Sequence, residues 1–484
     1  MEFMDVFVVG LALILIRLWW RRWSVTGRKR KNLPPGPPGW PLVGNLIQII
    51  LQRRHYVFIV GELRKLYGPI FTLQMGQRTM VIVTDSKLIH EALVQKGPAF
   101  ASRPPDSPIR LVFSVGKCAI NSAEYGPLWR TLRKNLVTEL ITPTRVKQCG
   151  WIRKWAIENH MERIKSECVE KGFVEISEER IKKIESILKD VMLVTSPQLP
   201  DFLPILTPLF RRQMKEAKAL RKRQIECLTP LINNRRAFVE KGENPHQEMV
   251  SPIGAAYIDS LFGLEPATRG PLGEEEYVTL CSEVISAGTD TSTTTVEWAM
   301  LNLVMYQDIQ EKLYQEIVDC VGKDGDIKED IEKMPYLEAV IKETLRRHPP
   351  GHFLLSHAAI KDTELGGYTI PAGVHVEFYT AWITENPDIW SDPGKFRPER
   401  FLQGDGVGVD VTGTRAVKMV PFGAGRRICP AWNLGILHIN LLIAKMVQAF
   451  KWVPVPDAPP DLTETYSFTV VMKNPLKAVI MPRA

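Results

Sequence analysis

The stretch 421–450 constrains this chain more than any other, because it joins a glycine-rich loop to a helix that has no polar face. The loop, Phe-Gly-Ala-Gly-Arg-Arg-Ile at 422–428, ends at Cys429. Apolar residues then recur in nearly every direction around a helical axis, so we expect the helix to be buried. We place Pro430 at its first position. The positive end of the helix dipole should favour the thiolate form of Cys429.

The loop itself suggests what such a thiolate would bind. Gly423 and Gly425 allow the backbone to approach a bulky planar ligand and can aim N–H groups at the sulfur atom. Arg427 can reach an anionic edge of that ligand. These parts together describe an axial thiolate ligand to haem iron. A buried structural cysteine is the usual alternative for a single free cysteine, but the spacing of the glycines and the arginine argues against it.

The same run resembles the haem-binding signature of the cytochrome P450 family, Phe-x-x-Gly-x-Arg-x-Cys-x-Gly. Phe422, Gly425, Arg427 and Cys429 stand at the matching positions. The resemblance implies that these four residues bind haem b and that Cys429 is the axial ligand of the iron. The chain departs from the signature at Ala431, where the family usually has glycine. We expect the added methyl group to tighten the passage into the helix without touching the chemistry.

Composition is compatible with one large domain in a reducing compartment. The 484 residues, 45% of them hydrophobic, can bury one large core or two smaller ones, and no repeat or long linker marks a split. The seven cysteines lie far apart, which argues against a zinc ribbon and a disulfide framework. The net charge of +8 comes largely from 1–33, which holds seven Lys and Arg residues, so a nucleic-acid partner is not indicated.

The N-terminus predicts a membrane anchor at 1–24. An apolar run is followed by Arg17 and two tryptophans, the residues before the run are acidic, and a basic cluster follows it at 28–31. This order favours an uncleaved anchor with a cytosolic body, and a helix lying on the membrane surface is the alternative. The basic and proline-rich stretch 25–38 predicts a stiff hinge, or otherwise a ligand for an SH3-like domain. An anchor followed by such a hinge is typical of microsomal family members, which implies the endoplasmic reticulum membrane.

The body at 39–484 should be mainly α with a minor β part. Two apolar runs at 71–73 and 80–83 flank Gly76 and predict a hairpin, and helical patterns dominate from Ser86 onward. The resemblance implies the cytochrome P450 fold, with one large haem-binding domain.

A long helix at 274–306 carries glycine and hydroxyl residues at its centre, where a helix prefers Ala or Leu. Such a local inconsistency points to function. The family resemblance implies that Ala287 and Gly288 leave room for haem and oxygen, and that Asp290 and Thr291 deliver protons. A plain hydroxyl-rich kink is the alternative.

Three further sets of residues gain roles from the resemblance. Trp129 and Arg133 lie four apart on a predicted helix and would hold a haem propionate. Glu343 and Arg346 lie three apart, and Arg400 would join them in a buried structural triad that fixes the cysteine loop. The apolar strand 353–355 would face the substrate.

The resemblance fails between 172 and 196. Related chains have an apolar helix of about five turns before the stretch that corresponds to 177–180, whereas here 173–176 leads directly into a charged run. The chain therefore lacks a core helix that normally packs against the long central helix. Its loss would expose apolar surface at roughly 25 cal/mol per Å², unless neighbouring segments repack.

The resemblance implies a haem-thiolate monooxygenase that takes electrons from NADPH through a flavoprotein reductase and inserts one oxygen atom into an apolar substrate. Stretches such as HPPGHFLLSHA look closest to plant enzymes that hydroxylate or epoxidise fatty acids within the chain. Two alternatives stay open. One is a haem-thiolate protein that binds ligands or rearranges peroxides without a reductase, and the other is an enzyme made defective by the missing helix.

Overall fold

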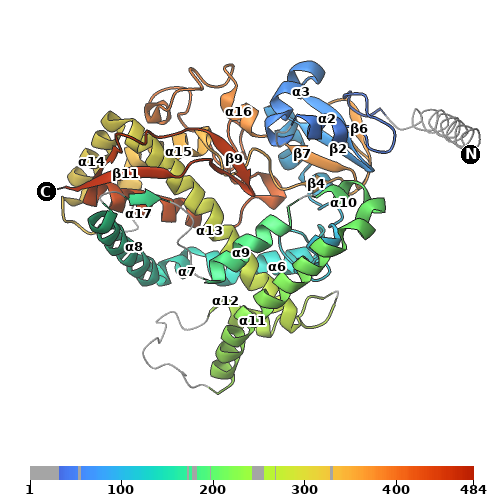
Figure 1. Cartoon of the computed structure of the whole chain (residues 1–484), viewed down its shortest axis with the longest axis horizontal. Helices are drawn as coiled ribbons and strands as arrows, with labels where there is room; N and C mark the ends of the chain where they lie inside the picture. The colour runs from blue at the N-terminus through green and yellow to red at the C-terminus, as the bar shows by residue number, and fades with distance from the viewer. Residues whose placement is uncertain are drawn as a thin grey trace, which may run out of the picture.

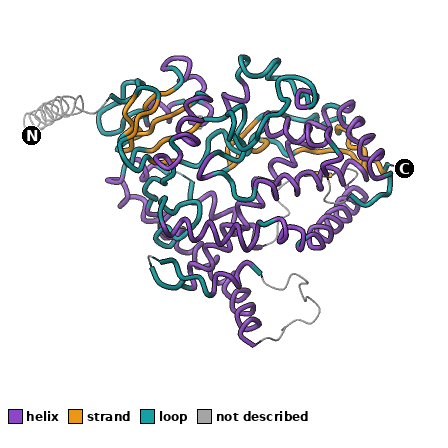
Figure 2. Tube along the Cα trace, turned by 180° about the vertical axis from the view of Figure 1, so that it is seen from behind, coloured by secondary structure: helices purple, strands orange, loops and turns teal. Residues whose placement is uncertain are grey.

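The computed structural model describes residues 32–52, 56–171, 174–176, 183–196, 198–241, 256–267, 269–327 and 331–483. Helices dominate this part of the chain, and the strands form small sheets in separate places (Figures 1 and 2). The prediction of a mainly α body with a minor β part is confirmed. The predicted anchor at 1–24 lies outside the described residues. Within those residues, no helix combines the length and the apolar character needed to cross a bilayer.

The largest sheet has four strands, in the order β1 (Ile70–Met75), β2 (Arg78–Val83), β7 (His375–Phe378) and β4 (His357–Ala358). β1 and β2 pair antiparallel across Gly76, which has φ +58°, so the predicted hairpin is confirmed. β2 and β7 pair in parallel. The strand predicted at 353–355 is wrong, because regular pairing begins only at His357 and Phe353 forms an isolated bridge.

The proline-rich segment packs against the edge of this sheet at Pro34 and Pro35. The Thr72 main-chain N–H donates to the carbonyl of Pro35 at 2.7 Å, and the Thr72 hydroxyl donates to Pro34 at 2.9 Å. A Cβ atom on Gly36 would lie only 1.9 Å from the Thr72 carbonyl oxygen. The described part of the predicted hinge is therefore bound to the body rather than standing off it as a spacer.

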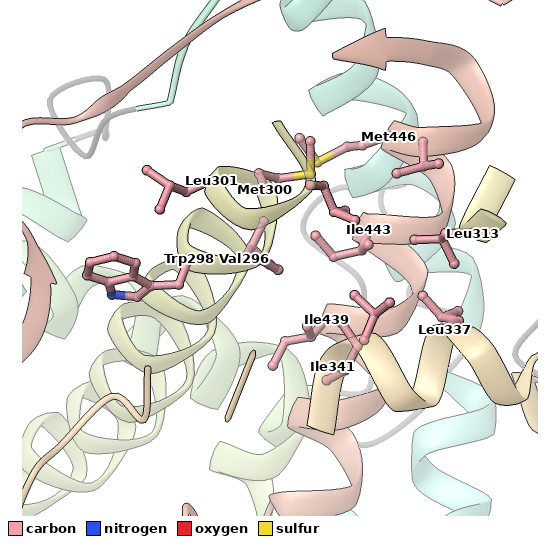
Figure 3. Packing of buried hydrophobic residues seen from close by; sticks show 14 of the residues in the cluster. Val296, Trp298, Met300, Leu301, Leu313, Leu337, Ile341, Ile439, Ile443 and Met446 are labelled. Carbon is pink, nitrogen blue, oxygen red and sulfur yellow. The ribbon is translucent and has the colours of Figure 1, made fainter. Parts of the chain in front are cut away.

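The core surrounds α13 (Glu274–Met305), which confirms the predicted long helix. α13 packs against α17 (Trp432–Ala449), α14 (Gln307–Val321) and α15 (Pro335–Arg347) through buried aliphatic and methionine side chains, whereas Trp298 points to the other side of α13 (Figure 3). Burying such side chains contributes about 1.5 to 3 kcal/mol each. This cluster holds α13 and the helix that follows the cysteine loop in a fixed relation.

The helix after the cysteine loop differs in two respects from the prediction. α17 begins at Trp432, with Ala431 as its N-cap, so the placement of Pro430 at the first helical position is wrong. Full burial is confined to its second half, from Ile439 to Gln448, and the first half is mostly half-buried.

The remaining elements surround this core (Figure 1). The other helices are α2 (Leu46–Leu51), α3 (Val60–Tyr67), α4 (Ser86–His90), α5 (Pro108–Ser114), α6 (Pro127–Leu136), α7 (Pro143–Gln148), α8 (Gly150–Lys171), α9 (Lys183–Val194), α10 (Leu199–Phe202), α11 (Arg211–Lys241), α12 (Tyr257–Phe262) and α16 (Ala381–Glu385). The other strands are β3 (Val174–Ile176), β5 (Thr363–Leu365), β6 (Tyr368–Ile370), β8 (Phe450–Pro454), β9 (Glu464–Ser467), β10 (Thr469–Met472) and β11 (Leu476–Pro482). Short 3-10 or π turns are η1 (Tyr56–Phe58), η2 (Glu91–Gln95), η3 (Gly97–Phe100), η4 (Val137–Ile141), η6 (Pro204–Phe210), η8 (Ile331–Lys333), η9 (Pro398–Phe401) and η10 (Gly425–Arg427).

The connection between β3 and α9 is short. β3 pairs with β11, and α9 packs against α11 and α13. Residues 177–182, which lie outside the described part, are all that joins them. An apolar helix of five turns needs about 18 residues, so this connection has no room for one. The consequence for stability stays a prediction.

Candidate functional site

The cysteine loop is closed by its own backbone and by glycine. The main-chain N–H of Cys429 donates to the carbonyl of Phe422 at 2.8 Å, which draws the two ends of the loop together. Gly423 and Gly425 have φ values of +73° and +66°, a region that favours glycine. A Cβ atom on Gly425 would lie 1.8 Å from the carbonyl oxygen of Leu93. Gly425 therefore has both a steric and a conformational reason to be glycine.

The protonation of Cys429 depends on more than the helix dipole. Burial raises the pKa of its thiol, while the nearby N–H of Ala431 and the charge of Arg133 lower it. The thiolate form of Cys429 stays a prediction. A bound metal cation would favour it, since a thiol that coordinates a metal is deprotonated.

The departure from the family signature at Ala431 has no conformational cost. Its backbone angles are φ −100° and ψ 20°, which an alanine adopts without strain. A Cβ atom added to Gly435, the nearest glycine of the helix, would lie 3.8 Å from the ring of Phe422, which is an ordinary contact. This turn therefore accepts the alanine that the sequence places there.

Arg427 and Arg133 flank the indole ring of Trp129. The guanidinium carbon of Arg427 lies 4.5 Å from the ring centroid, and that of Arg133 lies 5.9 Å from it. Arg133 also donates to the carbonyl of Ile428, next to the cysteine. The predicted pair on α6 is thus in direct contact with the cysteine loop.

A third arginine, Arg103, joins this group and was missed at the sequence level. Its Nε donates to the carbonyl of Asn121 at 2.7 Å, and its Nη1 donates to Leu355 and Ser356 at 2.9 and 2.8 Å. Arg103, Arg133 and Arg427 are called the arginine group below. Arg103 lies in no motif, and its partners are distant in the sequence, so no local signal could have found it.

The arginine group fits an anionic ligand. Burial, together with the positive charges of Arg103 and Arg133, lowers the pKa of Arg427 to about 9. Burial likewise lowers the pKa of Arg103 to about 10. The indole N–H of Trp129 is buried without a hydrogen-bond partner among the described residues. Three crowded cations and an unused N–H donor suit the two propionate groups of a haem.

Arg427 also binds three main-chain carbonyls, a role that the signature did not reveal. Its three guanidinium nitrogens donate to the carbonyls of Ala101, Ile120 and Ala123 at 2.7, 3.1 and 2.6 Å. These bonds fix the side chain before any ligand binds. Its contact with an anionic edge of the ligand stays a prediction.

The centre of α13 is a regular helix. The hydroxyl of Thr291 donates to the carbonyl of Ala287 at 2.7 Å, and Thr289, Thr293 and Thr295 make the same bond one turn back. This is the pattern expected of the alternative reading, a hydroxyl-rich helix. A Cβ atom built on Gly288, however, would meet no atom within 4 Å. The small residues therefore leave open space beside the hydroxyl groups.

Asp290 and Thr291 do not share one environment. The Asp290 side chain is buried, at 7% exposure, whereas Thr291 is half-buried. Adjacent residues of a helix point about 100° apart, so the carboxylate lies on another side of α13. Their joint role in proton delivery stays a prediction.

The predicted structural triad is assembled. Arg346 donates two hydrogen bonds of 2.7 Å to the carboxylate of Glu343, and Arg400 donates one of 3.1 Å. All three side chains are fully buried. Two partners were not predicted: Trp390, whose ring lies 5.4 Å from the Arg346 guanidinium, and Asp405, which accepts from Arg400 at 3.1 Å.

The triad is also bonded to the segment that precedes the cysteine loop. Arg346 donates to the carbonyls of Thr384, Pro393 and Lys395, and Glu343 accepts the main-chain N–H of Arg397 at 2.9 Å. A buried ion group with this many fixed partners specifies one conformation of the chain around it.

Comparison with known proteins agrees with this geometry. The sequence model of the family "Cytochrome P450" matches residues 34–179 and 154–481. The chain is 37% identical to "Cytochrome P450 89A9" of Arabidopsis thaliana, over 93% of this chain and 94% of that one. It is 30% identical to "Flavonoid 3'-monooxygenase" of the same plant, over 99% and 97%. A solved zebra fish cytochrome P450 with abiraterone shares the fold, with a TM-score of 0.68 at 23% identity, over 89% of this chain and 100% of that one.

The family match also bears on the short connection after β3. It comes in two overlapping pieces, and the first piece ends at 179, within the connection 177–182. The alignment with the Arabidopsis relative is 493 positions long, which exceeds the 484 residues of this chain. The alignment therefore contains gaps, and the absence of the family's helix after β3 stays a prediction.

Proposed function

The chain belongs to the cytochrome P450 family, and we propose that it is a membrane-anchored haem-thiolate monooxygenase that inserts one atom of O2 into an apolar substrate. The observation that carries the proposal is the site around Trp129. One buried and two half-buried arginines, together with an indole N–H that has no hydrogen-bond partner among the described residues, lie near a cysteine in a glycine-closed loop. This combination of positive charge and a free donor suits the anionic groups of a haem.

Haem iron, when bound, supplies the redox centre that activates molecular oxygen. Cys429 would bind the haem iron, and Trp129, Arg133 and Arg427 would hold the propionates. Thr291 passes a proton into the site through its hydroxyl, and to do so it gives up the bond to Ala287 that it makes in the structure.

Electrons would come from NADPH through a flavoprotein reductase. One observation supports this. Arg130 and Lys134 are exposed on α6, the helix that carries Trp129 and Arg133. Exposed positive charge on the helix that contacts the cysteine loop suits an acidic partner surface.

The endoplasmic reticulum membrane is the proposed location, with a single anchor at 1–24. Large apolar side chains are exposed at Leu51 (75%), Ile205 (77%) and Leu209 (77%). The main-chain N–H of Gln77 donates to the Phe202 carbonyl at 2.8 Å, which brings 202–209 close to the N-terminal sheet. Exposed apolar groups near the N-terminal part of the body suit contact with the bilayer that holds the anchor.

A fatty acid is the proposed substrate, oxidised within its chain by hydroxylation or epoxidation. The support is the resemblance of the stretch 348–358 to fatty-acid oxidising enzymes and the apolar character of Phe353, Leu354 and Leu355. A planar phenolic compound is the alternative, because one relative is named for a flavonoid.

The test is reconstitution of the full chain, loaded with haem, with an NADPH-dependent flavoprotein reductase. We expect NADPH-dependent oxygen consumption and a product heavier than the substrate by one oxygen atom. Parallel assays with a long-chain fatty acid and with a flavonoid distinguish the two substrate classes.

Two control assays address the remaining alternatives. Turnover with an organic hydroperoxide and no reductase, in the absence of NADPH-dependent product, would instead indicate peroxide rearrangement. Haem binding without either activity would indicate an enzyme made defective by the missing helix.

A further inference from the structure

We propose that Glu283 is a positioning residue for the haem, acting through the loop 120–123. The inference rests on the proposed haem-thiolate function. Glu283 lies on α13 two turns before Thr291, about 12 Å along the helix. At that distance it is too far to act on the same reacting atom. Its role must therefore be exerted through the residues that it contacts.

The carboxylate of Glu283 accepts two successive main-chain N–H groups. Its Oε2 accepts from Ile120 at 2.8 Å, and its Oε1 accepts from Asn121 at 2.6 Å. The loop lies more than 160 residues away in sequence, so these bonds tie α13 to the segment before α6. Two charge-assisted bonds to one peptide segment are short and directional.

The carbonyl groups of the same two residues are bound from the opposite side. Arg427 donates to the Ile120 carbonyl at 3.1 Å, and Arg103 donates to the Asn121 carbonyl at 2.7 Å. All four main-chain hydrogen-bonding groups of Ile120 and Asn121 are thus taken by charged side chains. These side chains come from α13, from the cysteine loop and from the segment before α5.

This arrangement places Glu283 at the base of the proposed propionate site. The loop that it holds supplies two of the three carbonyls that bind Arg427, and Arg427 lies 4.5 Å from the ring of Trp129. If the N–H side of the loop is released, its carbonyls are no longer fixed, and Arg427 and Arg103 lose the defined acceptors that the loop provides. The expected consequence is a less ordered arginine group and a weaker hold on the haem.

The chemistry of the residue supports this role. Burial raises the pKa of Glu283 more than the two N–H donors and the charges of Arg103 and Arg427 lower it, which leaves the pKa at about 7. A carboxylate is costly at this place, and a neutral acceptor such as glutamine accepts only one of the two N–H groups. The carboxylate is therefore the group that satisfies both donors together.

The test measures the rate at which haem leaves the loaded full-length protein to an excess of apomyoglobin. Glu283→Gln has the same shape but keeps one acceptor, and we expect haem loss to be faster on the order of tenfold. Glu283→Asp keeps both acceptor oxygens and should restore part of the retention. Glu275→Gln, an exposed position on the same helix, is the matched control and should lose haem at the wild-type rate.

A double-mutant cycle distinguishes positioning from a general loss of stability. In the Arg427→Lys background, Glu283→Gln should accelerate haem loss by less than about threefold, because both changes disable the same path. Additive effects, or a Glu283→Gln rate equal to wild type, would overturn the inference. If wild type itself holds no haem, the proposed function fails instead. If Glu283→Gln does not fold, Glu283→Asp carries the same cycle.

Discussion

The cysteine loop and the centre of α13 are built in opposite ways. Around the loop, Arg427 and Arg133 bond to main-chain groups in other parts of the chain, and Gly425 touches the backbone of Leu93. At the centre of α13, the threonine hydroxyls bond to carbonyls of their own helix. The loop depends on long-range contacts, whereas the helix centre is locally self-sufficient.

This difference separates the residues that would hold the haem from those that would take part in the reaction. A change in or behind the loop should alter whether the haem is held, because many distant partners move together. A change at the centre of α13 should leave the haem in place and alter only what happens to oxygen and protons. Each substitution below tests one side of this comparison.

The largest effect is expected at Cys429. Cys429→Ser replaces the thiol by a hydroxyl, which is a poor axial donor to ferric iron. Monooxygenase turnover should fall to background, which an assay with reductase and NADPH measures. Cys320→Ser, at an exposed position, is the control and should keep wild-type turnover. Equal turnover of Cys429→Ser and wild type would remove the central role of this residue.

The next largest effect is expected at the buried triad, which lies behind the cysteine loop. Glu343→Ala leaves the guanidinium groups of Arg346 and Arg400 buried without their carboxylate. Breaking a buried ion group in this way costs about 3 to 5 kcal/mol. Urea unfolding should show this loss, together with lower haem content. Glu338→Ala, on the same helix but half exposed, should change stability by less than about 1 kcal/mol. Similar losses in both variants would mean that the triad has no special role.

Lengthening the short connection after β3 would test whether the packing of the core limits haem retention. Missing buried side chains cost about 2 to 5 kcal/mol each, and a domain is stable by only about 5 to 15 kcal/mol. Insertion of a related enzyme's apolar helix, roughly 20 residues, after Ile176 should raise the melting temperature and the haem content. A chain that already binds one haem and melts like its relatives would show instead that its neighbours have repacked.

The smallest effect on structure, with a clear effect on chemistry, is expected at Thr291. Thr291→Ala removes a hydroxyl whose only described bond is within the helix, so stability and haem content should change little. Product formed per NADPH consumed should fall several-fold, because oxygen would be reduced without ordered proton delivery. Unchanged coupling would assign proton delivery to Asp290 or to water.

The sequence predicted well where function depends on local spacing. Cys429, Gly425 and Arg427 stand in one loop, and Trp129 with Arg133 stands one turn apart, so their grouping follows from local spacing although their distant partners do not. The long helix and the hairpin were predicted for the same reason, since the periodicity of apolar residues is a local property.

The misses have physical causes. The role of Arg103 could not be predicted from the sequence, because acceptors such as the carbonyl of Leu355 lie as far as 252 residues away. The proline-rich segment appeared to be a spacer because its composition does not reveal that Thr72 binds it.

The absorption spectrum of the reduced, carbon monoxide-bound full-length protein tests the central claim most directly, because it reports iron, thiolate ligation and folding together. The account predicts a Soret band at the long-wavelength position that a thiolate ligand produces, which should disappear in Cys429→Ser. A wild-type protein with a short-wavelength band of the kind that an imidazole or a neutral thiol gives, or with no haem band, would contradict it.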